Sequence, residues 1–505
     1  MSNVPMSLFR SPAPGLCLRV TRWAALCLTL VGASPVLAAD APAPLVFTPY
    51  AFETQEHGTI AAEAGYLEVP RRHADPNGPR MRLRVVRLPA TGGDRRAAPV
   101  VYLAGGPGGS GIGTGRGPRW PVFDQVRRET DVLLLDQRGA GESEPPPPCP
   151  HQHTFDDAQP LQHDAALAAL RGVAARCVAY WREAGVDLGA YTTAESAADL
   201  EDLRRALKVP KISLWGMSYG THLALATVRL HGAGLGRVVL MGTEGPDDTL
   251  KLPLSADALL AKLSGAAKEA GFDDLTGSAM RVLAALREQP RQGRSVMHGG
   301  KPVMIGEYDA QLAISASLGR RMTQQWLPLI LRDAENGDYD LLAAMLLLLR
   351  SEYGSYGAMS LAMDVASGQS PQRRALAEAQ ARESLFGDAL NFPFPALGDG
   401  LGLVDLGDAF RGPLRSNVPV LFISGTLDGR TPPANAEALR PGFRDSRTLL
   451  ARGASHDNEM WLGNPAIAAG IADFLAGRAV GDAELDVGAP VFARSKRDLV
   501  DPRGR

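Results

Sequence analysis

The residues most able to do chemistry lie in the pentapeptide 216–220, which reads Gly-Met-Ser-Tyr-Gly. An all-apolar run at 212–215 precedes it and a helix-forming stretch at 222–230 follows it. A strand, a sharp turn and a helix in this order are what a nucleophile elbow requires. The pattern therefore predicts Ser218 as a nucleophile at a helix N-terminus, where the dipole favours developing negative charge.

A serine hydroxyl needs a base to remove its proton and an acid to orient that base. When the nucleophile lies on such an elbow, the acid and then the base follow it along the chain. His456 alone among the nine histidines lies beyond the last predicted strands, and Asp428 lies just past the predicted strand 418–423. We therefore expect His456 as base and Asp428 as acid. The alternatives are a surface histidine and a turn-forming aspartate, and Asp457 is expected to be a solvated neighbour or helix cap.

The carbonyl under attack also needs N–H donors for its oxyanion. The backbone N–H of Tyr219, directly after the serine, is the first expected donor. The second is expected from residues 104–111, Ala-Gly-Gly-Pro-Gly-Gly-Ser-Gly, which follow the apolar run 100–103. We prefer the N–H of Gly106, because residues without side chains let the backbone approach a tetrahedral centre closely.

The same loop matches the Gly-x-Gly-x-x-Gly dinucleotide fingerprint at 106–111, with Asp136 downstream of it. That fingerprint requires a helix to open within the motif. Residues 111–121 contain four glycines and two prolines, so we expect no helix there. The sequence therefore argues against a dinucleotide, and no other cofactor is expected.

The hydrophobic pattern divides the chain into three stretches. Between 45 and 87, short apolar and polar runs alternate, which indicates antiparallel strands. From 99 to 245, all-apolar runs such as 132–135 and 238–241 are separated by helical segments, which indicates a parallel sheet with helices on both faces. From 246 to 413 the strand signal is lost and helical segments such as 339–350 and 371–384 dominate.

The strand pattern resumes at 418–423 and 448–450, and a helix is expected near 465–475. An excursion of about 170 residues between strands of one sheet is much longer than an ordinary loop. We therefore expect a signal peptide at 1–39, a core at 40–245, a helical cap at 246–413, and the rest of the core with a C-terminal tail at 414–505.

The N-terminal residues have the layout of a secretory signal peptide. Arg10, Arg19 and Arg22 precede an apolar run at 23–33, and small residues follow at 36–39. An apolar run of about eleven residues is too short to span a bilayer, which needs about twenty. We expect an exported protein, periplasmic or secreted, without a stable membrane anchor.

The net charge of −2 over 505 residues gives no basic field. Proteins that bind nucleic acid neutralise phosphates with clustered lysine and arginine, so nucleic acid is not an expected partner. The expected partner is a peptide or small ester substrate. The sequence does not indicate an oligomeric state.

Cys149 and Cys177 are the two cysteines that remain once the signal peptide is removed. An oxidising compartment permits a disulfide between them, which would stabilise the fold by about 3 kcal/mol; two free thiols are the alternative. Neither cysteine lies in a Cys-x-x-Cys or histidine pattern, so no metal site is expected.

These motifs together resemble the proline iminopeptidase and tripeptidyl aminopeptidase family of α/β-hydrolases. The resemblance rests on the Gly-Gly-Pro-Gly loop, the run Asp-Gln-Arg-Gly-Ala-Gly-Glu-Ser at 136–143, the elbow at 216–220, and the surroundings of Asp428 and His456. It covers roughly residues 66–477 without the cap. It implies an α/β-hydrolase fold, a mostly parallel central sheet with helices on both faces and an inserted helical cap. It also implies release of residues or short peptides from free N-termini, with acidic groups that bind the substrate's α-ammonium.

The chain departs from the family pattern at two places. Ala104 stands where the iminopeptidases have histidine, which favours the tripeptidyl branch over proline specificity. Residues 241–245 read Met-Gly-Thr-Glu-Gly where the tripeptidyl branch has an Asp-Gly pair, so Glu244 is our candidate for ammonium binding, with a helix-capping carboxylate as the alternative. Arg138 is expected to fix the turn after 132–135 through backbone carbonyls.

The expected function is that of an exported serine hydrolase, an aminopeptidase that works through an acyl-enzyme on Ser218. A carboxylesterase acting on small esters is the second hypothesis, because the fold and the triad serve many chemistries. A non-catalytic binding protein is the third hypothesis, and the presence of all three triad residue types in the required order argues against it.

Overall fold

The computed structural model describes residues 45–92, 97–288 and 293–500, which belong to one unit of the chain, Ala41–Arg505. The predicted signal peptide lies outside the described residues. Ten strands form one sheet in the order β1-β2-β3-β5-β4-β6-β7-β10-β11-β12. Their bounds are β1 Thr48–Glu53, β2 Thr59–Pro70, β3 Arg80–Leu88, β4 Val100–Leu103, β5 Val132–Leu135, β6 Ile212–Met217, β7 Leu235–Met241, β10 Val420–Gly425, β11 Ser446–Arg452 and β12 Ala483–Asp486.

The sheet has an antiparallel part and a parallel part, as the two hydrophobic patterns predict. Strands β1, β2, β3 and β5 pair antiparallel in that order, and every neighbouring pair from β5 to β12 is parallel. All residues of β4, β5 and β6 are buried. Neighbouring residues of β6 enter two separate cores, Leu214 on one face and Trp215 on the other.

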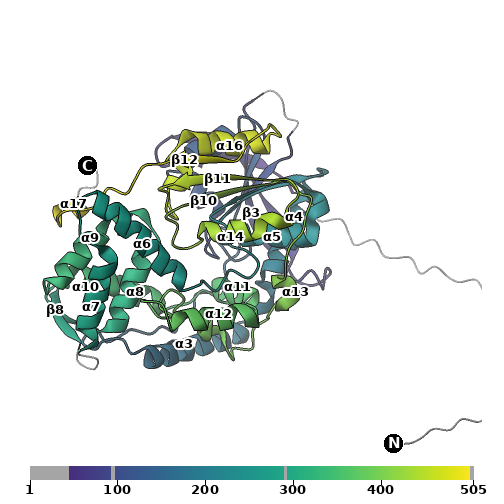
Figure 1. Cartoon of the computed structure of the whole chain (residues 1–505). Coiled ribbons are helices and arrows are strands. Elements are labelled where there is room, and N and C mark those ends of the chain that lie inside the picture. Colours follow the sequence, from purple (N-terminus) through teal and green to yellow (C-terminus); the bar gives the residue numbers. More distant parts are fainter. Residues whose placement is uncertain (1–44, 93–96, 289–292, 501–505) are drawn as a thin grey trace, which may run out of the picture. The chain divides into compact units, whose positions relative to one another are not determined.

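Helices cover both faces of the sheet (Figure 1). Leu170, Leu200 and Leu223 of α3, α4 and α5 belong to one core, and Phe123 and Ile471 of α2 and α16 belong to the other. Within the described ranges, no helix is both long and apolar enough to cross a bilayer. The helices outside the insertion are α1 Gly111–Arg116, α2 Trp120–Val126, α3 His163–Glu183, α4 Thr193–Ala206, α5 Tyr219–His231, α14 Pro433–Leu439, α15 Glu459–Leu462, α16 Pro465–Leu475 and α17 Arg497–Val500.

Between β7 and β10 the chain makes the long excursion that the sequence predicts as a cap, drawn in teal and green in Figure 1. Its helices are α6 Leu254–Glu269, α7 Leu275–Arg287, α8 Glu307–Ser317, α9 Arg321–Glu335, α10 Asp340–Tyr353, α11 Ala358–Ser367, α12 Pro371–Ala381 and α13 Gly407–Arg411.

The insertion also contains a β-hairpin, which corrects the expectation that it has no strands. Strands β8 Arg294–His298 and β9 Lys301–Ile305 pair antiparallel. Gly299 and Gly300 join them with φ of +55° and +79°, the double positive-φ turn that two-residue hairpins favour. The Gly-Gly pair was the available sequence signal for this hairpin.

The glycine-rich stretch after β4 forms a short helix, so the prediction that it could not was wrong. Helix α1 begins after Ser110, whose hydroxyl caps the helix by accepting a bond from the Gly113 N–H. A Cβ at Gly111 would lie 2.4 Å from the Leu135 carbonyl oxygen, and one at Gly115 would lie 2.6 Å from a side chain of β5. Close packing on β5 therefore requires these glycines and outweighs their low helix propensity.

Asp136, which a dinucleotide site would use to bind ribose, is occupied within the protein. One of its oxygens accepts bonds from the Ser110 hydroxyl at 2.7 Å and the Ile112 N–H at 3.2 Å. The other accepts the Glu142 N–H at 2.8 Å. The acidic residue therefore holds the glycine-rich loop against the turn after β5, and this role argues against ribose recognition.

Cys149 and Cys177 form a disulfide that ties the segment after β5 to α3. The cysteines are 28 residues apart, and closing a loop of that length removes denatured-state entropy worth about 3 kcal/mol. We expect the double variant Cys149→Ala/Cys177→Ala to lose about that much free energy of unfolding, measured by urea denaturation. Wild-type protein unfolded under reducing conditions is the control. Equal urea midpoints for the variant, the reduced wild type and the oxidised wild type would contradict the prediction.

Candidate active site

Ser218 lies at the turn between β6 and α5, where the sequence places it. Its φ of 56° is in the left-handed region, which residues other than glycine rarely adopt and which is common at functional turns. The flanking glycines are required by contact, because a Cβ at Gly216 would lie 2.4 Å from the Gly220 carbonyl oxygen and one at Gly220 would lie 2.1 Å from that of Leu103. The elbow therefore packs directly on β4, beside which the strand order reverses, and ligands bind at such points in open parallel sheets.

Asp428 and His456 follow β10 and β11, and the structure brings them together. Nδ1 of His456 lies 2.8 Å from an oxygen of Asp428. The carboxylate also accepts the N–H groups of Arg430 and Thr431 and the Thr431 hydroxyl, all at 2.8 Å. Burial alone would raise the pKa of Asp428, but the His456 ring and these bonds lower it below its ordinary value.

A charged Asp428 fixes the tautomer of the histidine. The carboxylate accepts a bond from Nδ1–H, so Nε2 carries no proton and is free to accept one. The hydroxyl of Thr431 lies 3.0 Å from the same Nδ1 and braces the pair. The role of Thr431 was not found from the sequence, because a threonine in a turn gives no specific signal.

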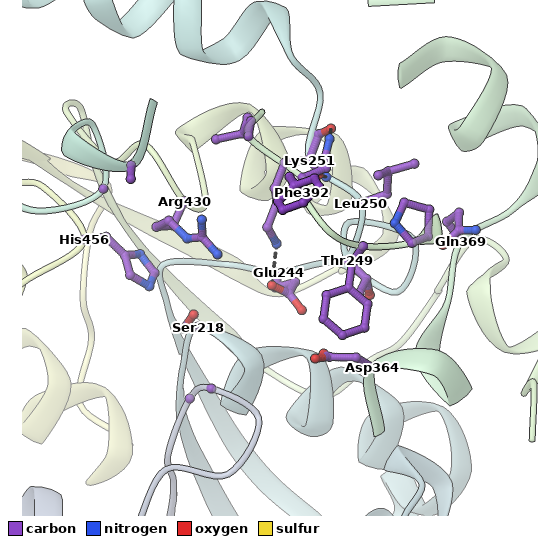
Figure 2. A pocket seen from close by; sticks show the side chains of 18 of the residues that line it. Ser218, Glu244, Thr249, Leu250, Lys251, Asp364, Gln369, Phe392, Arg430 and His456 are labelled. Atoms are coloured by element: carbon purple, nitrogen blue, oxygen red, sulfur yellow. Dashed lines mark hydrogen bonds and ion pairs between the residues drawn. The ribbon is translucent and has the colours of Figure 1, made fainter. Parts of the chain in front are cut away.

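His456 and Ser218 line the same cavity, whose volume is about 1680 Å³. Figure 2 shows the ring of His456 pointing toward the Ser218 hydroxyl. The neighbouring Asp457 instead faces Arg119, at 3.8 Å, and Arg119 donates to Asn458 at 2.9 Å. Asp457 therefore belongs to a separate ion pair at the cavity wall.

Both expected oxyanion donors are neighbours of the serine. Gly106 lines the cavity and has φ of +121°, which only glycine adopts easily. A Cβ at Gly105 would lie 2.9 Å from Cβ of Ser218, so this loop packs against the nucleophile. Tyr219 is the first residue of α5, where a backbone N–H has no acceptor within the helix.

A buried hydrogen-bond chain ties the elbow to the insertion. The Tyr219 hydroxyl and the Thr193 hydroxyl are 2.9 Å apart, and Thr193 lies 2.9 Å from the hydroxyl of Ser367 on α11. Ser367 lies 3.1 Å from Nε2 of His222, whose Nδ1 is 3.0 Å from the Gly245 carbonyl oxygen. The chain fixes α11 and the loop after β7 relative to the nucleophile. Sequence reasoning missed it because its members come from four separate elements.

Glu244, the expected ammonium ligand, is buried in the cavity wall but already has a partner. Nζ of Lys251 lies 2.5 Å from its carboxylate (Figure 2). Burial would raise the pKa of Glu244, but Lys251 keeps it below the ordinary value. The structure therefore places Glu244 in the cavity as one half of an ion pair.

Asp364 of α11 is a second carboxylate of the cavity, and the sequence gave no signal for it. Its side chain points into the cavity (Figure 2), and among the described residues its carboxylate has no hydrogen bond or ion pair. Burial, together with the charge of Glu244, raises the pKa of Asp364 to about 8. Over the described part of the chain, no group of three or more His, Cys, Asp or Glu side chains could hold a metal ion.

Arg138 lies outside this cavity and supports the fold. It is fully buried and donates to the carbonyl oxygens of Arg71 at 2.8 Å and Ala190 at 2.6 Å, as the sequence predicts. It also binds both carboxylate oxygens of Asp199, a partner that spacing alone does not indicate.

Family models match both parts of the sheet. A model of the alpha/beta hydrolase fold matches residues 98–296, which include the elbow and the glycine loop. A model of TAP-like proteins matches residues 408–483, which include Asp428 and His456.

Curated relatives share about a third of the sequence over the matched stretches. The chain is 31% identical to tripeptidyl aminopeptidase of Streptomyces lividans over 198 residues, which are 36% of this chain and 36% of that protein. It is 29% identical to serine protease Hip1 of Mycobacterium tuberculosis over 213 residues, 40% of this chain and 39% of that one. It is 28% identical to proline iminopeptidase of Xylella fastidiosa over 155 residues, 30% of this chain and 34% of that one.

The chain thus spans little more than a third of the length of the curated relatives it matches. The matches agree with the sheet order, the elbow and the family resemblance of the motifs. The chain is therefore an α/β-hydrolase-fold protein with a TAP-like C-terminal part, and it is related to serine peptidases of the tripeptidyl aminopeptidase and proline iminopeptidase kind.

Proposed function

We propose that this protein is a serine peptidase that removes residues or short peptides from free N-termini. The observation that carries the proposal is one cavity lined by Ser218, by His456 and by the unpaired carboxylate of Asp364, with Asp428 bonded to the far side of the His456 ring. A nucleophile with an oriented base supports hydrolysis, and an uncompensated carboxylate nearby supports recognition of a substrate cation.

Acyl transfer begins when His456 takes the proton of Ser218 as the hydroxyl attacks the substrate carbonyl. The oxyanion of the tetrahedral intermediate is held by the N–H groups of Gly106 and Tyr219. His456 then gives its proton to the leaving amine, and the C–N bond breaks. Water, deprotonated by His456, attacks the acyl-enzyme and restores Ser218.

The size and charge of the cavity favour a peptide over a small ester. Pockets for small ligands typically have volumes of about 300–1,000 Å³, whereas this cavity has about 1680 Å³. A simple ester also carries no cation for Asp364 to bind. A carboxylesterase remains the second candidate function because the catalytic groups would serve either acyl donor.

A substrate panel tests the proposal. It compares aminoacyl and tripeptidyl anilides with free N-termini, the same compounds with acetylated N-termini, and short p-nitrophenyl esters. Faster hydrolysis of the free-amine compounds supports the exopeptidase, while equal rates with and without the acetyl group would exclude it. Hydrolysis of the esters alone would favour the carboxylesterase.

Both cavity carboxylates are expected to affect KM for free-amine peptides, for different physical reasons. Asp364→Asn should raise KM for free-amine peptides about tenfold, because the variant loses the unpaired charge that binds the ammonium. Glu244→Gln should also raise KM, because it leaves the Lys251 cation uncompensated beside the substrate. Steady-state kinetics with free-amine peptides and p-nitrophenyl esters measures both effects.

The control is Asp164→Asn, which changes a fully exposed aspartate at the start of α3. Neither cavity variant should change ester hydrolysis to the same extent as peptide hydrolysis. Equal losses on peptides and esters would show that these carboxylates support the fold and do not bind the ammonium.

The pH dependence of the preference for free-amine peptides tests whether Asp364 binds the substrate ammonium. With its pKa raised to about 8, Asp364 becomes charged only as the pH rises toward that value, while a peptide α-amine with a pKa of about 8 loses its charge above it. The ratio of kcat/KM for free-amine over acetylated peptide should therefore peak near pH 8, because effects common to both substrates cancel in the ratio. Asp364→Asn should flatten the acidic limb of this ratio.

The proposal includes export from the cytoplasm. The disulfide between Cys149 and Cys177 supports an oxidising compartment, and the signal-peptide pattern at 1–39 supports secretion. N-terminal sequencing of protein recovered outside the cytoplasm should begin at residue 39 or 40. Recovery of full-length chain from the cytoplasm with both thiols free would contradict export.

A further inference from the structure

Most charged side chains that line the cavity are compensated within the protein. Lys251 pairs with Glu244, and Arg119 with Asp457. The remaining pairs of the lining are Arg374 with Asp399 and Arg411 with Asp405 and Asp408.

Arg430 departs from this pattern. Its guanidinium lines the cavity, and among the described residues it has no hydrogen bond or ion pair. Figure 2 shows it projecting into the cavity between His456 and Lys251. Arg320, Glu352 and Asp364 also line the wall without an ion pair in the described part of the chain. Of these groups, Figure 2 shows Arg430 and Asp364 around the same cavity as Ser218 and His456.

The backbone that carries Arg430 is held rigidly. Its N–H donates at 2.8 Å to Asp428, so one carboxylate orients both His456 and this arginine. From the insertion, Gln324 donates at 2.8 Å to the carbonyl oxygens of Leu318 and Leu427. A Cβ at Gly319 would lie 3.4 Å from Cδ of Arg430, so the turn between α8 and α9 packs against its side chain.

The position of Arg430 relative to Ser218 determines which part of a substrate it meets. His456 must protonate the leaving amine, so the leaving fragment lies on the His456 side of Ser218. Arg430 lies between His456 and Lys251, whereas Asp364 lies farther from His456, on the other side of Ser218 (Figure 2). On the proposed exopeptidase function, the cavity thus presents a free anion to the acylating fragment and a free cation to the leaving fragment.

We propose that Arg430 binds the free C-terminal carboxylate of the leaving fragment, so that the substrates are short peptides with both termini free. Guanidinium matches carboxylate in bidentate geometry and keeps its charge at every physiological pH. This inference rests on the proposed function and narrows its substrate class from N-termini in general to oligopeptides.

Matched peptides test the inference. Tetra-alanine with a free N-terminus is supplied with either a C-terminal carboxylate or a C-terminal amide, and depletion is followed by mass spectrometry. We expect wild type to prefer the carboxylate by about tenfold or more in kcat/KM. Arg430→Gln should bring this ratio close to one, and Arg430→Lys should retain part of the preference. Arg444→Gln, which changes an exposed arginine outside the cavity lining, should keep the full preference.

Fluorophosphonate labelling of Ser218 in each variant shows that the catalytic site is intact. A wild-type ratio near one, or an unchanged ratio in Arg430→Gln, would overturn the inference while leaving the exopeptidase standing. Equal cleavage of N-acetylated and free tetra-alanine would instead remove the proposed function, and with it the zwitterionic substrate.

Discussion

Replacing Ser218 with alanine should lower kcat/KM for peptide hydrolysis by about 10⁴- to 10⁶-fold, because the proposed mechanism forms the acyl-enzyme on this hydroxyl. The oxyanion donors at Gly106 and Tyr219 are backbone groups and remain in place, so a small residual rate above the uncatalysed reaction is expected. Steady-state kinetics and loss of fluorophosphonate labelling measure the effect. The two readouts should disappear together.

Ser351→Ala provides the matched control. Ser351 is an exposed serine of α10 whose hydroxyl donates to the carbonyl oxygen of Leu348 in its own helix. It should keep wild-type labelling and rate. Persistent labelling of Ser218→Ala, or loss of less than about tenfold in rate, would mean that the nucleophile lies elsewhere.

The strands and helices of the core could be predicted because their burial requires a recognisable pattern of apolar residues. Strands β4 and β5 match the expected runs at 100–103 and 132–135, and α16 matches the helix expected at 465–475. Strands covered on both faces must be apolar throughout, so a continuous apolar run between turns marks them without any knowledge of partners.

The errors have two sources, a tertiary contact that overrides local propensity and a strand pair that carries no apolar run. Helix α1 forms despite its glycines because Gly111 and Gly115 must pack closely on β5, and propensity alone cannot register that neighbour. The hairpin β8–β9 has charged, half-exposed strands, so no apolar run marks it. The first case is a local rule overridden by a contact with another strand, whereas in the second the Gly-Gly turn was a local signal that the apolar pattern did not include.

The candidate site likewise contains residues that the sequence indicates and residues that it does not. The proposed nucleophile, acid and base stand in motifs with fixed order at strand ends, so the sequence could indicate Ser218, Asp428 and His456. Asp364 and Arg430 carry no motif, and we single them out because, over the described part of the chain, their side chains have no ion pair, unlike most charged groups of the cavity lining. Whether a charged side chain has a partner can be seen only in the folded structure, because it depends on which side chains of the insertion lie near the sheet.

Asp428→Asn should lower kcat about 10⁴-fold while leaving the shape of the site unchanged. An amide at this position can present N–H to Nδ1 of His456, which would then place the imidazole proton on Nε2, facing Ser218. The base is lost although every residue stays in place. KM for a free-amine peptide should change little, because the amide oxygen of the variant can still accept the Arg430 N–H bond. Steady-state kinetics with a single tripeptidyl substrate separates kcat from KM.

Asp457→Asn is the informative comparison because Asp457 is adjacent to His456 and also lines the cavity. Its carboxylate faces Arg119, whereas Nδ1 of the histidine faces Asp428. The variant should therefore lose no more than a few-fold in kcat. If Asp457→Asn caused the larger loss and Asp428→Asn the smaller, the acid of the triad would have been assigned to the wrong carboxylate. The hydrogen bonds that Thr431 and Arg430 make to Asp428 would then be interactions that stabilise a turn.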